Sequence, residues 1–119
     1  MSIYVPVILR ANCTSRKRFE ADFLIDTGAG NTIAPAKSLR EAGIEPVGVM
    51  AYELTDGSKV EYAFGLAVFE FMGEITSGRV IFGPDDAEAR LGGTALRSAG
   101  FVIDPASQKL KRLPAVPLK

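Results

Sequence analysis

An aspartate at the end of an apolar run is the feature of this sequence with the clearest chemical meaning. The run ends in Asp26, and Thr27, Gly28 and Ala29 follow it. A carboxylate at the end of a buried strand is costly unless something uses it. The two small residues allow a sharp backbone turn and let another group approach the carboxylate. We interpret Asp26 as a candidate catalytic acid, approached by a second copy of the same carboxylate.

Two carboxylates about 3 Å apart share one proton, because they cannot both be ionised. The ionised acid acts as a base toward water, and the protonated acid polarises the carbonyl group under attack. The sequence contains one Asp-Thr-Gly triplet, so the second acid has to come from another molecule, which a two-fold axis supplies. On the triplet alone, a turn in which Asp26 caps backbone N–H groups is the simpler interpretation.

Composition limits the chemistry further. The 119 residues suit a single domain over 1–119, and 14 basic side chains balance 14 acidic ones, which gives no electrostatic reason to expect nucleic acid or a membrane as partner. No apolar run is long enough to span a bilayer and no signal-peptide pattern is present, so we expect a cytoplasmic protein. The absence of histidine excludes His-containing triads and His-based metal sites, and the single Cys13 excludes an internal disulfide. We expect no cofactor and no metal, and we expect Cys13 to be a half-buried strand residue.

Many short apolar segments separated by turn residues predict an all-β fold, a small and mostly antiparallel barrel or sandwich. The expected strands are 3–9, 19–25, 31–34, 47–54, 60–64, 66–71, 79–82, 101–103 and 110–113, and the expected short helices are 36–42 and 94–99. Thr94 is the expected N-cap of the second helix. Prolines make the C-terminal tail, 114–119, a poor strand.

Turn residues predict where the strands reverse. Asp56 followed by Gly57 is typical of a two-residue hairpin turn. We expect a bulge at Gly65. We also expect a second turn bracketed by Gly73 and Gly78.

The order of several motifs resembles that of the retropepsin-like aspartic proteases, the family of retroviral proteases and their cellular and microbial relatives. Segment 24–29 resembles the family's active-site loop, and 80–84 resembles the strand before its second loop. Segment 91–100 resembles that second loop and the helix that follows, and 101–105 resembles the next strand in microbial members. The hairpin tip at 55–58 lies where the family has its flap. The resemblance spans nearly the full chain.

The resemblance implies a retropepsin-like closed or folded β-barrel with one or two short helices and an aspartic endopeptidase activity. Such an enzyme hydrolyses peptide bonds with an Asp-activated water and works as a homodimer. Asp26, one from each chain, is the implied catalytic residue. Thr27, Gly28 and Ala29 form the implied supporting loop, in which Thr27 makes a contact across the dimer and Gly28 presents a carbonyl to the substrate.

The implied substrate is an extended protein or peptide segment held between a flap hairpin, about 50–64, and the floor of the site. The implied substrate-binding residues are Gly30, Thr55, Asp56, Gly57 and Ser58. Tyr52 or Tyr62 contacts the substrate if the flap assignment is right.

Three residues depart from the family pattern. Gly30 lies where viral enzymes often have a second acid, and Gly93 replaces an arginine that braces the viral dimer. Arg90 replaces an aliphatic residue, which is expected to alter the packing beneath the active site. Arg90, Gly93 and the unusual flap support a second hypothesis, a catalytically inactive member of the same fold that acts as a dimeric peptide-binding or assembly module.

A third resemblance comes from a different class of protein. Segment 25–32 also resembles the phosphate loop of the actin and sugar-kinase superfamily. That fold needs two large domains, for which the chain is too short, and no P-loop pattern is present. Peptide hydrolysis by a homodimer is therefore the main hypothesis.

Overall fold

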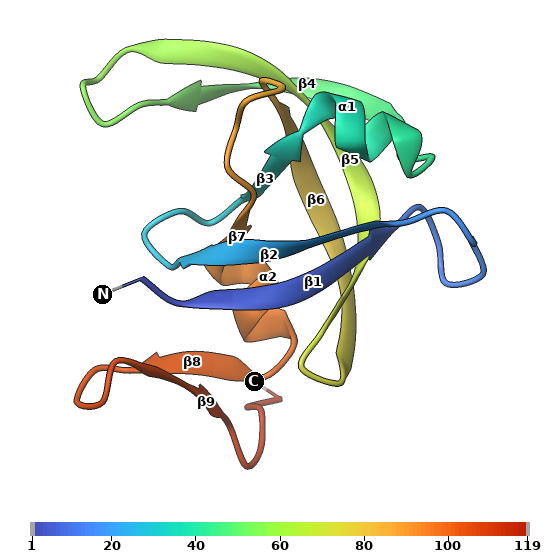
Figure 1. Ribbon diagram of the computed structural model, residues 1–119. Helices are drawn as coiled ribbons and strands as arrows, with labels where there is room; N and C mark the ends of the chain where they lie inside the picture. Colours follow the sequence, from blue (N-terminus) through green and yellow to red (C-terminus); the bar gives the residue numbers. More distant parts are fainter. Residues whose placement is uncertain (1, 119) are drawn as a thin grey trace.

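A closed β-barrel is the main body of the protein in the computed structural model, which describes residues 2–118. The sheet has seven strands in the order β1-β2-β7-β3-β6-β5-β4, and a further β1–β5 pairing closes six of them into the barrel (Figure 1). The strands are β1 Tyr4–Arg10, β2 Phe19–Asp26, β3 Thr32–Pro35, β4 Pro46–Glu53, β5 Lys59–Phe71, β6 Glu74–Gly83, β7 Arg90–Gly92, β8 Phe101–Asp104 and β9 Lys109–Arg112. The predicted all-β barrel is confirmed.

Alternating side chains of the barrel strands form the core, as the two-residue period of a strand requires. In β1 the buried residues are Val5, Val7 and Leu9, and the residues between them are exposed or partly buried. Phe69 and Phe71 of β5 point to the same interior. Closing the barrel pairs β1 with β5 and leaves β4, which lies outside it, with one free edge.

The β5–β6 hairpin differs from the sequence prediction. Its turn is Met72–Gly73, where both residues have positive φ, 51° and 80°, which is the geometry of a tight type I′ turn. The predicted turn between Gly73 and Gly78 is wrong, because β6 continues through Gly78, which pairs with Ala67 of β5. Hydrogen bonding along the whole length of β5 outweighs the low strand propensity of Gly78.

The predicted bulge lies on the other strand of its pair. Pro46 pairs with Gly65, and Gly48 pairs with Phe64, so the extra residue is Val47 of β4. A Cβ at Gly65 would lie 2.8 Å from the Glu45 carbonyl oxygen. The glycine therefore allows a close approach of two backbones rather than an irregularity in its own strand.

The β4–β5 hairpin, the segment predicted as the flap and called the flap below, extends beyond the barrel, since β4 pairs with β5 alone. Figure 1 shows its tip on the same side of the molecule as the β2–β3 loop. The predicted two-residue turn is wrong, because Leu54 and Ser58 are paired and the loop between them has three residues, 55–57. The Leu54 N–H donates to the Ser58 carbonyl, and the Gly57 N–H donates to the Leu54 carbonyl. Gly57 has φ +86°, which a three-residue loop with a glycine bulge requires.

The two short helices lie close to their predicted positions. α1 spans Ala36–Glu41 and buries Leu39, and Gly43 follows at φ +80°, as a C-terminal cap requires. α2 spans Gly93–Ser98. Its N-cap is Gly92 without a side-chain hydrogen bond, so the prediction of Thr94 as N-cap is wrong.

A separate two-stranded hairpin of β8 and β9 packs beside the barrel (Figure 1). The Phe101 ring lies 5.8 Å from the Phe71 ring, and the Arg112 guanidinium lies 4.8 Å above Phe101. At the opposite end of the chain, Cys13 is exposed in the turn after β1, so its predicted half-buried strand position is wrong. Within residues 2–118, neither helix has the length and apolar character needed to cross a bilayer.

We predict that Met72→Asn stabilises the fold by about 0.5–1 kcal/mol, because asparagine adopts positive φ at lower cost than methionine. Urea denaturation measures the free energy of unfolding. Met50→Asn is the matched control, since Met50 is 40% exposed and Met72 43%, but Met50 lies in a strand, where asparagine is disfavoured. Equal effects of the two substitutions would contradict the turn geometry.

Candidate active site

The register of β2 and β7 positions the candidate catalytic acid. Asp26 is the last residue of β2 and pairs in parallel with Gly92, and Leu24 pairs with Arg90. Asp26 and Arg90 therefore lie on the same face of the sheet as diagonal neighbours. The Asp26 side chain is 31% exposed, so its carboxylate is accessible while the strand below it is fixed by the barrel.

Three backbone N–H groups of the β7–α2 segment hold the loop that follows Asp26. The Gly93 N–H donates to the Ala29 carbonyl at 2.9 Å, and the Thr94 N–H donates to the Gly30 carbonyl at 3.2 Å. The Gly92 N–H donates to Thr32 Oγ1 at 3.0 Å, and Thr32, 2% exposed, is the one buried polar residue in the described part of the chain. The loop is thus held at Ala29 and Gly30, and at Thr32 where it enters β3.

This contact requires glycine at position 92. A Cβ there would lie 2.5 Å from the Asn31 carbonyl carbon and 2.6 Å from the Gly30 carbonyl oxygen, closer than real Cβ atoms approach. At Gly28 a Cβ would lie 3.5 Å from Asp26 Oδ1, an ordinary contact, and φ is not in the left-handed region. The sharp turn that the sequence suggested at Gly28 does not need glycine. The close passage of the Gly92 backbone over the loop does.

A groove of about 940 Å³ lies between this loop and the flap. We call it the flap groove. Six of the residues predicted for the site line it, namely Asp26, Gly28, Ala29, Gly30, Thr55 and Asp56. Thr27, Gly57 and Ser58 do not line it; Thr27 is exposed beside the groove, and the other two lie in the flap turn.

Other groove residues were not singled out as binding residues by their sequence pattern. They are Asn31, Ile33, Glu53, Leu54, Ile81 and Arg90, and the two tyrosines considered for substrate contact, Tyr52 and Tyr62, also line the groove. Ile33 pairs with both Arg90 and Ile81, across β7 and β6. Ile33, Ile81 and Arg90 are neighbours because the strand order β7-β3-β6 brings distant segments of the chain together. This arrangement could not be foreseen, since β7 was not predicted as a strand.

The Arg90 guanidinium lies directly beside the candidate acid. Its Nη1 is 3.4 Å from Asp26 Oδ2, and its Nη2 is 3.5 Å from Glu88 Oε1. The Tyr4 hydroxyl donates to Glu88 Oε2 at 3.0 Å, and this hydrogen bond to Glu88 raises the pKa of Tyr4. The expectation that Arg90 alters packing beneath the site is wrong, because Arg90 lies on the groove surface, 45% exposed.

Asp56, the acid nearest the flap tip, has a structural role in its turn. Its Oδ1 accepts hydrogen bonds from the Ser58 N–H at 2.9 Å and from the Ser58 hydroxyl at 2.5 Å. These bonds lower the pKa of Asp56, first through the hydroxyl and then through the N–H. Asp56 therefore stabilises the turn of the hairpin through its side chain.

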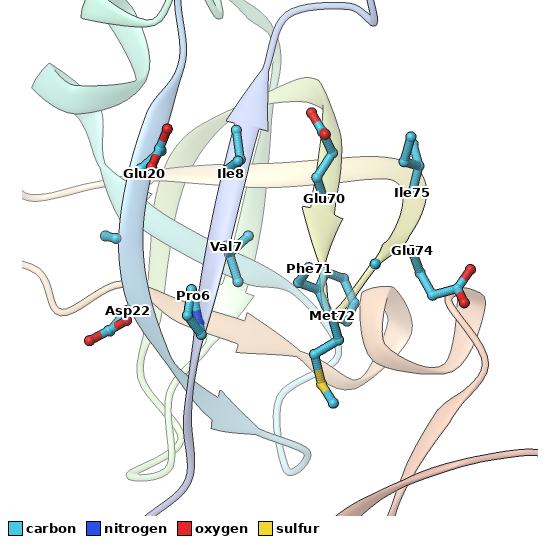
Figure 2. A pocket seen from close by; sticks show the side chains of 12 residues that line it. Pro6, Val7, Ile8, Glu20, Asp22, Glu70, Phe71, Met72, Glu74 and Ile75 are labelled. Atoms are coloured by element: carbon cyan, nitrogen blue, oxygen red, sulfur yellow. The ribbon is translucent and has the colours of Figure 1, made fainter.

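A second hollow, of about 630 Å³, lies on the outer wall of the barrel. Figure 2 shows four carboxylates around it, those of Glu20, Asp22, Glu70 and Glu74. Arginines neutralise three of them: Arg18 is 2.6 Å from Glu20, Arg10 is 2.6 Å from Glu70, and Arg112 pairs with Glu74. No group of three potential metal ligands occurs within residues 2–118. We interpret this surface as a set of ion pairs, of which Arg10–Glu70 joins the neighbouring strands β1 and β5.

Comparisons with known proteins identify no matching family model and no significant match among curated proteins. The retropepsin resemblance therefore stays a prediction based on the motifs. The alternative of an actin-type or sugar-kinase phosphate loop does not fit, because its two large domains have no counterpart in this small barrel.

We predict that Gly92→Ala destabilises the protein by about 1–3 kcal/mol, because the new methyl group meets main-chain atoms that cannot move without breaking the loop contact. Urea denaturation of purified protein measures the loss. Gly78→Ala is the matched control, since position 78 is also in a strand and nothing lies within 4 Å of its Cβ. We expect that variant within about 0.5 kcal/mol of the parent. A Gly92 variant as stable as the control would contradict the close contact between Gly92 and the backbone of Gly30 and Asn31.

Proposed function

We propose that this protein is an aspartic endopeptidase that acts as a homodimer, with one Asp26 from each chain. The observation that carries this proposal is the position of Asp26. Its carboxylate lies at the end of a barrel strand, on the floor of a groove that a β-hairpin covers. A partly exposed acid in such a groove fits a reaction on an extended chain better than a capping role, because its side-chain oxygens accept no backbone N–H within residues 2–118.

The proposed reaction uses the two carboxylates as base and acid. The ionised Asp26 takes a proton from a water molecule, and the water oxygen attacks the peptide carbonyl carbon. The protonated Asp26 of the other chain gives its proton to the carbonyl oxygen. Collapse of the tetrahedral intermediate breaks the C–N bond as a proton passes to the leaving nitrogen, which gives a carboxylic acid and an amine.

The loop after Asp26 suits a two-fold arrangement. Gly28 and Ala29 are small, so a second copy of the loop can approach the carboxylate closely. The Thr27 side chain is exposed and its hydroxyl has no hydrogen-bond partner within residues 2–118. It is therefore available to a second molecule. The bonds from the β7–α2 segment hold this loop before the partner arrives, which favours a defined distance between the two acids.

The groove suits an extended peptide as substrate. Backbone from the loop 28–31 forms one wall and the flap strand β4 the other, so a peptide between them can form main-chain hydrogen bonds as an added strand. Ile33, Ile81 and Leu54 give the groove apolar surface for side chains. We propose a protein or peptide substrate on this basis.

We predict that Asp26→Asn lowers the rate of peptide hydrolysis by about 10³-fold, because an amide cannot take a proton from water. The assay is digestion of a peptide library at several pH values, read by mass spectrometry. Asp22→Asn is the matched control: Asp22 lies in the same strand, but it borders the outer hollow and not the flap groove.

The homodimer is tested separately by mixing. Adding Asp26→Asn protein to a fixed amount of wild type should reduce hydrolysis, because mixed dimers carry one acid only. Light scattering over a dilution series should show the dimer at the concentrations at which hydrolysis occurs. Hydrolysis that survives Asp26→Asn, or that belongs to a monomer, would contradict the proposal.

A second function is favoured by one observation, the contact between Arg90 and Asp26. A guanidinium 3.4 Å from the carboxylate competes with a second acid for the same oxygens, which suits a dimeric peptide-binding or assembly module without catalysis. We predict that Arg90→Leu leaves hydrolysis within about tenfold of the wild type if the protein is a protease. A wild type that binds peptides without cleaving them, together with cleavage by Arg90→Leu, would favour the binding module.

A further inference from the structure

The N–H group at the end of β7 donates to a side chain and not to the neighbouring strand. Within residues 2–118, β3 and β7 share one pair of ladder residues, Ile33 and Arg90. Continuing this antiparallel register would place Gly92 opposite Asn31. The Gly92 N–H instead donates to Thr32 Oγ1 at 3.0 Å. Gly92 is buried, so removing that oxygen would leave a buried donor without its protein partner, which is costly.

Thr32 reaches Gly92 from the interior of the barrel. Along β3, Thr32 and Ala34 are buried and Ile33 between them is partly buried. Ile33 lines the flap groove, so Thr32 points to the opposite face of the sheet, as the two-residue period of a strand requires. A peptide in the groove does not touch Thr32. Any effect of its hydroxyl on a reaction in the groove therefore passes through Gly92.

Gly92 connects this hydrogen bond to the candidate acid. It is the ladder partner of Asp26 in the parallel β2–β7 pair. The next two N–H groups, those of Gly93 and Thr94, donate to carbonyls of the loop that follows Asp26. A shift of Gly92 would therefore move the direct neighbour of the acid together with the donors that hold its loop. Because β7 has three residues only, the bond at its end is a large share of what fixes it.

We propose that Thr32 is a positioning residue for Asp26. Its hydroxyl oxygen fixes Gly92, and through Gly92 it sets the place of the acid and of the loop 27–30 before a second copy of the chain arrives. This inference rests on the proposed function, since hydrolysis depends on the exact place of Asp26 only if two such acids have to meet. A misplacement of about 1 Å in an active site costs on the order of 100-fold in rate.

The first test measures hydrogen exchange of single amides by NMR in Thr32→Val, where a methyl group replaces the hydroxyl. The Gly92 amide should exchange about tenfold faster than in wild type, because its acceptor is lost. The amides of Gly93 and Thr94 should follow. Both increases should exceed that of the β5–β6 ladder, whose amides report global unfolding. Thr32→Ser keeps the oxygen and should exchange like wild type.

The second test measures peptide hydrolysis at concentrations where light scattering shows the dimer. We expect kcat of Thr32→Val to fall about tenfold or more, while KM changes less than about threefold, because the flap and the apolar floor of the groove stay in place. Thr32→Ser should restore kcat to within about threefold of wild type. Thr76→Val is the matched control: its hydroxyl in β6 bonds to Ser98 at the far end of α2, and its loss should leave kcat unchanged.

The possible results separate the two proposals. If hydrolysis depends on Asp26 but Thr32→Val keeps kcat within about threefold of wild type, this inference is overturned and the proposed function stands. Exchange that rises equally at Gly92 and along the β5–β6 ladder assigns Thr32 a general role in stability, which also overturns the inference. If wild type cleaves no peptide, both proposals fail. Should Thr32→Val not fold, Thr32→Cys replaces it in both tests, since sulfur is a weak acceptor.

Discussion

The passage of the β7–α2 segment across the loop after Asp26 is the constraint on which the rest of the site depends. Gly92 lies so close to Asn31 that no side chain fits between them. Because the two backbones touch, consecutive N–H groups reach the loop carbonyls and the buried Thr32 hydroxyl. The barrel thereby fixes Asp26 through β2 and the following loop through β7. A loop held in this way retains its shape without a ligand, as a preorganised site requires.

The same constraint explains why Arg90 lies beside Asp26. Gly92 is the direct neighbour of Asp26 and has no side chain, so the diagonal neighbour two residues earlier fills the space next to the carboxylate. Glu88 holds the other nitrogen of the guanidinium, which divides the arginine between two acids. A pair as exposed as this one contributes little to stability. In the proposed dimer, Arg90 either moves aside when a second Asp26 arrives, or it keeps that acid away.

The sequence predicted the barrel and the position of the acid, because both depend on local patterns: alternating apolar residues and an apolar run that ends in Asp26. It failed where contacts between distant segments decide. Gly78 suggested a turn, but the long ladder with β5 makes it a strand residue. The short strand β7 could not be recognised, since a three-residue strand has no periodicity of its own and exists through its neighbours β2 and β3. Arg90 was noted as a departure from the family pattern, but its position beside Asp26 could not be predicted without that strand.

Two groups with few or no polar partners within residues 2–118 belong to residues that line the same groove. The Asp26 carboxylate has a single long contact to Arg90, and the Tyr52 hydroxyl has none. Elsewhere, Glu70 and Glu74 are paired with arginines, and Asp56 and Asp104 are bonded within turns. Exceptions to polar pairing concentrate at functional sites, because a ligand or a partner completes them. The sparse pairing of Asp26 at an accessible position supports our proposal that this groove is the site of reaction.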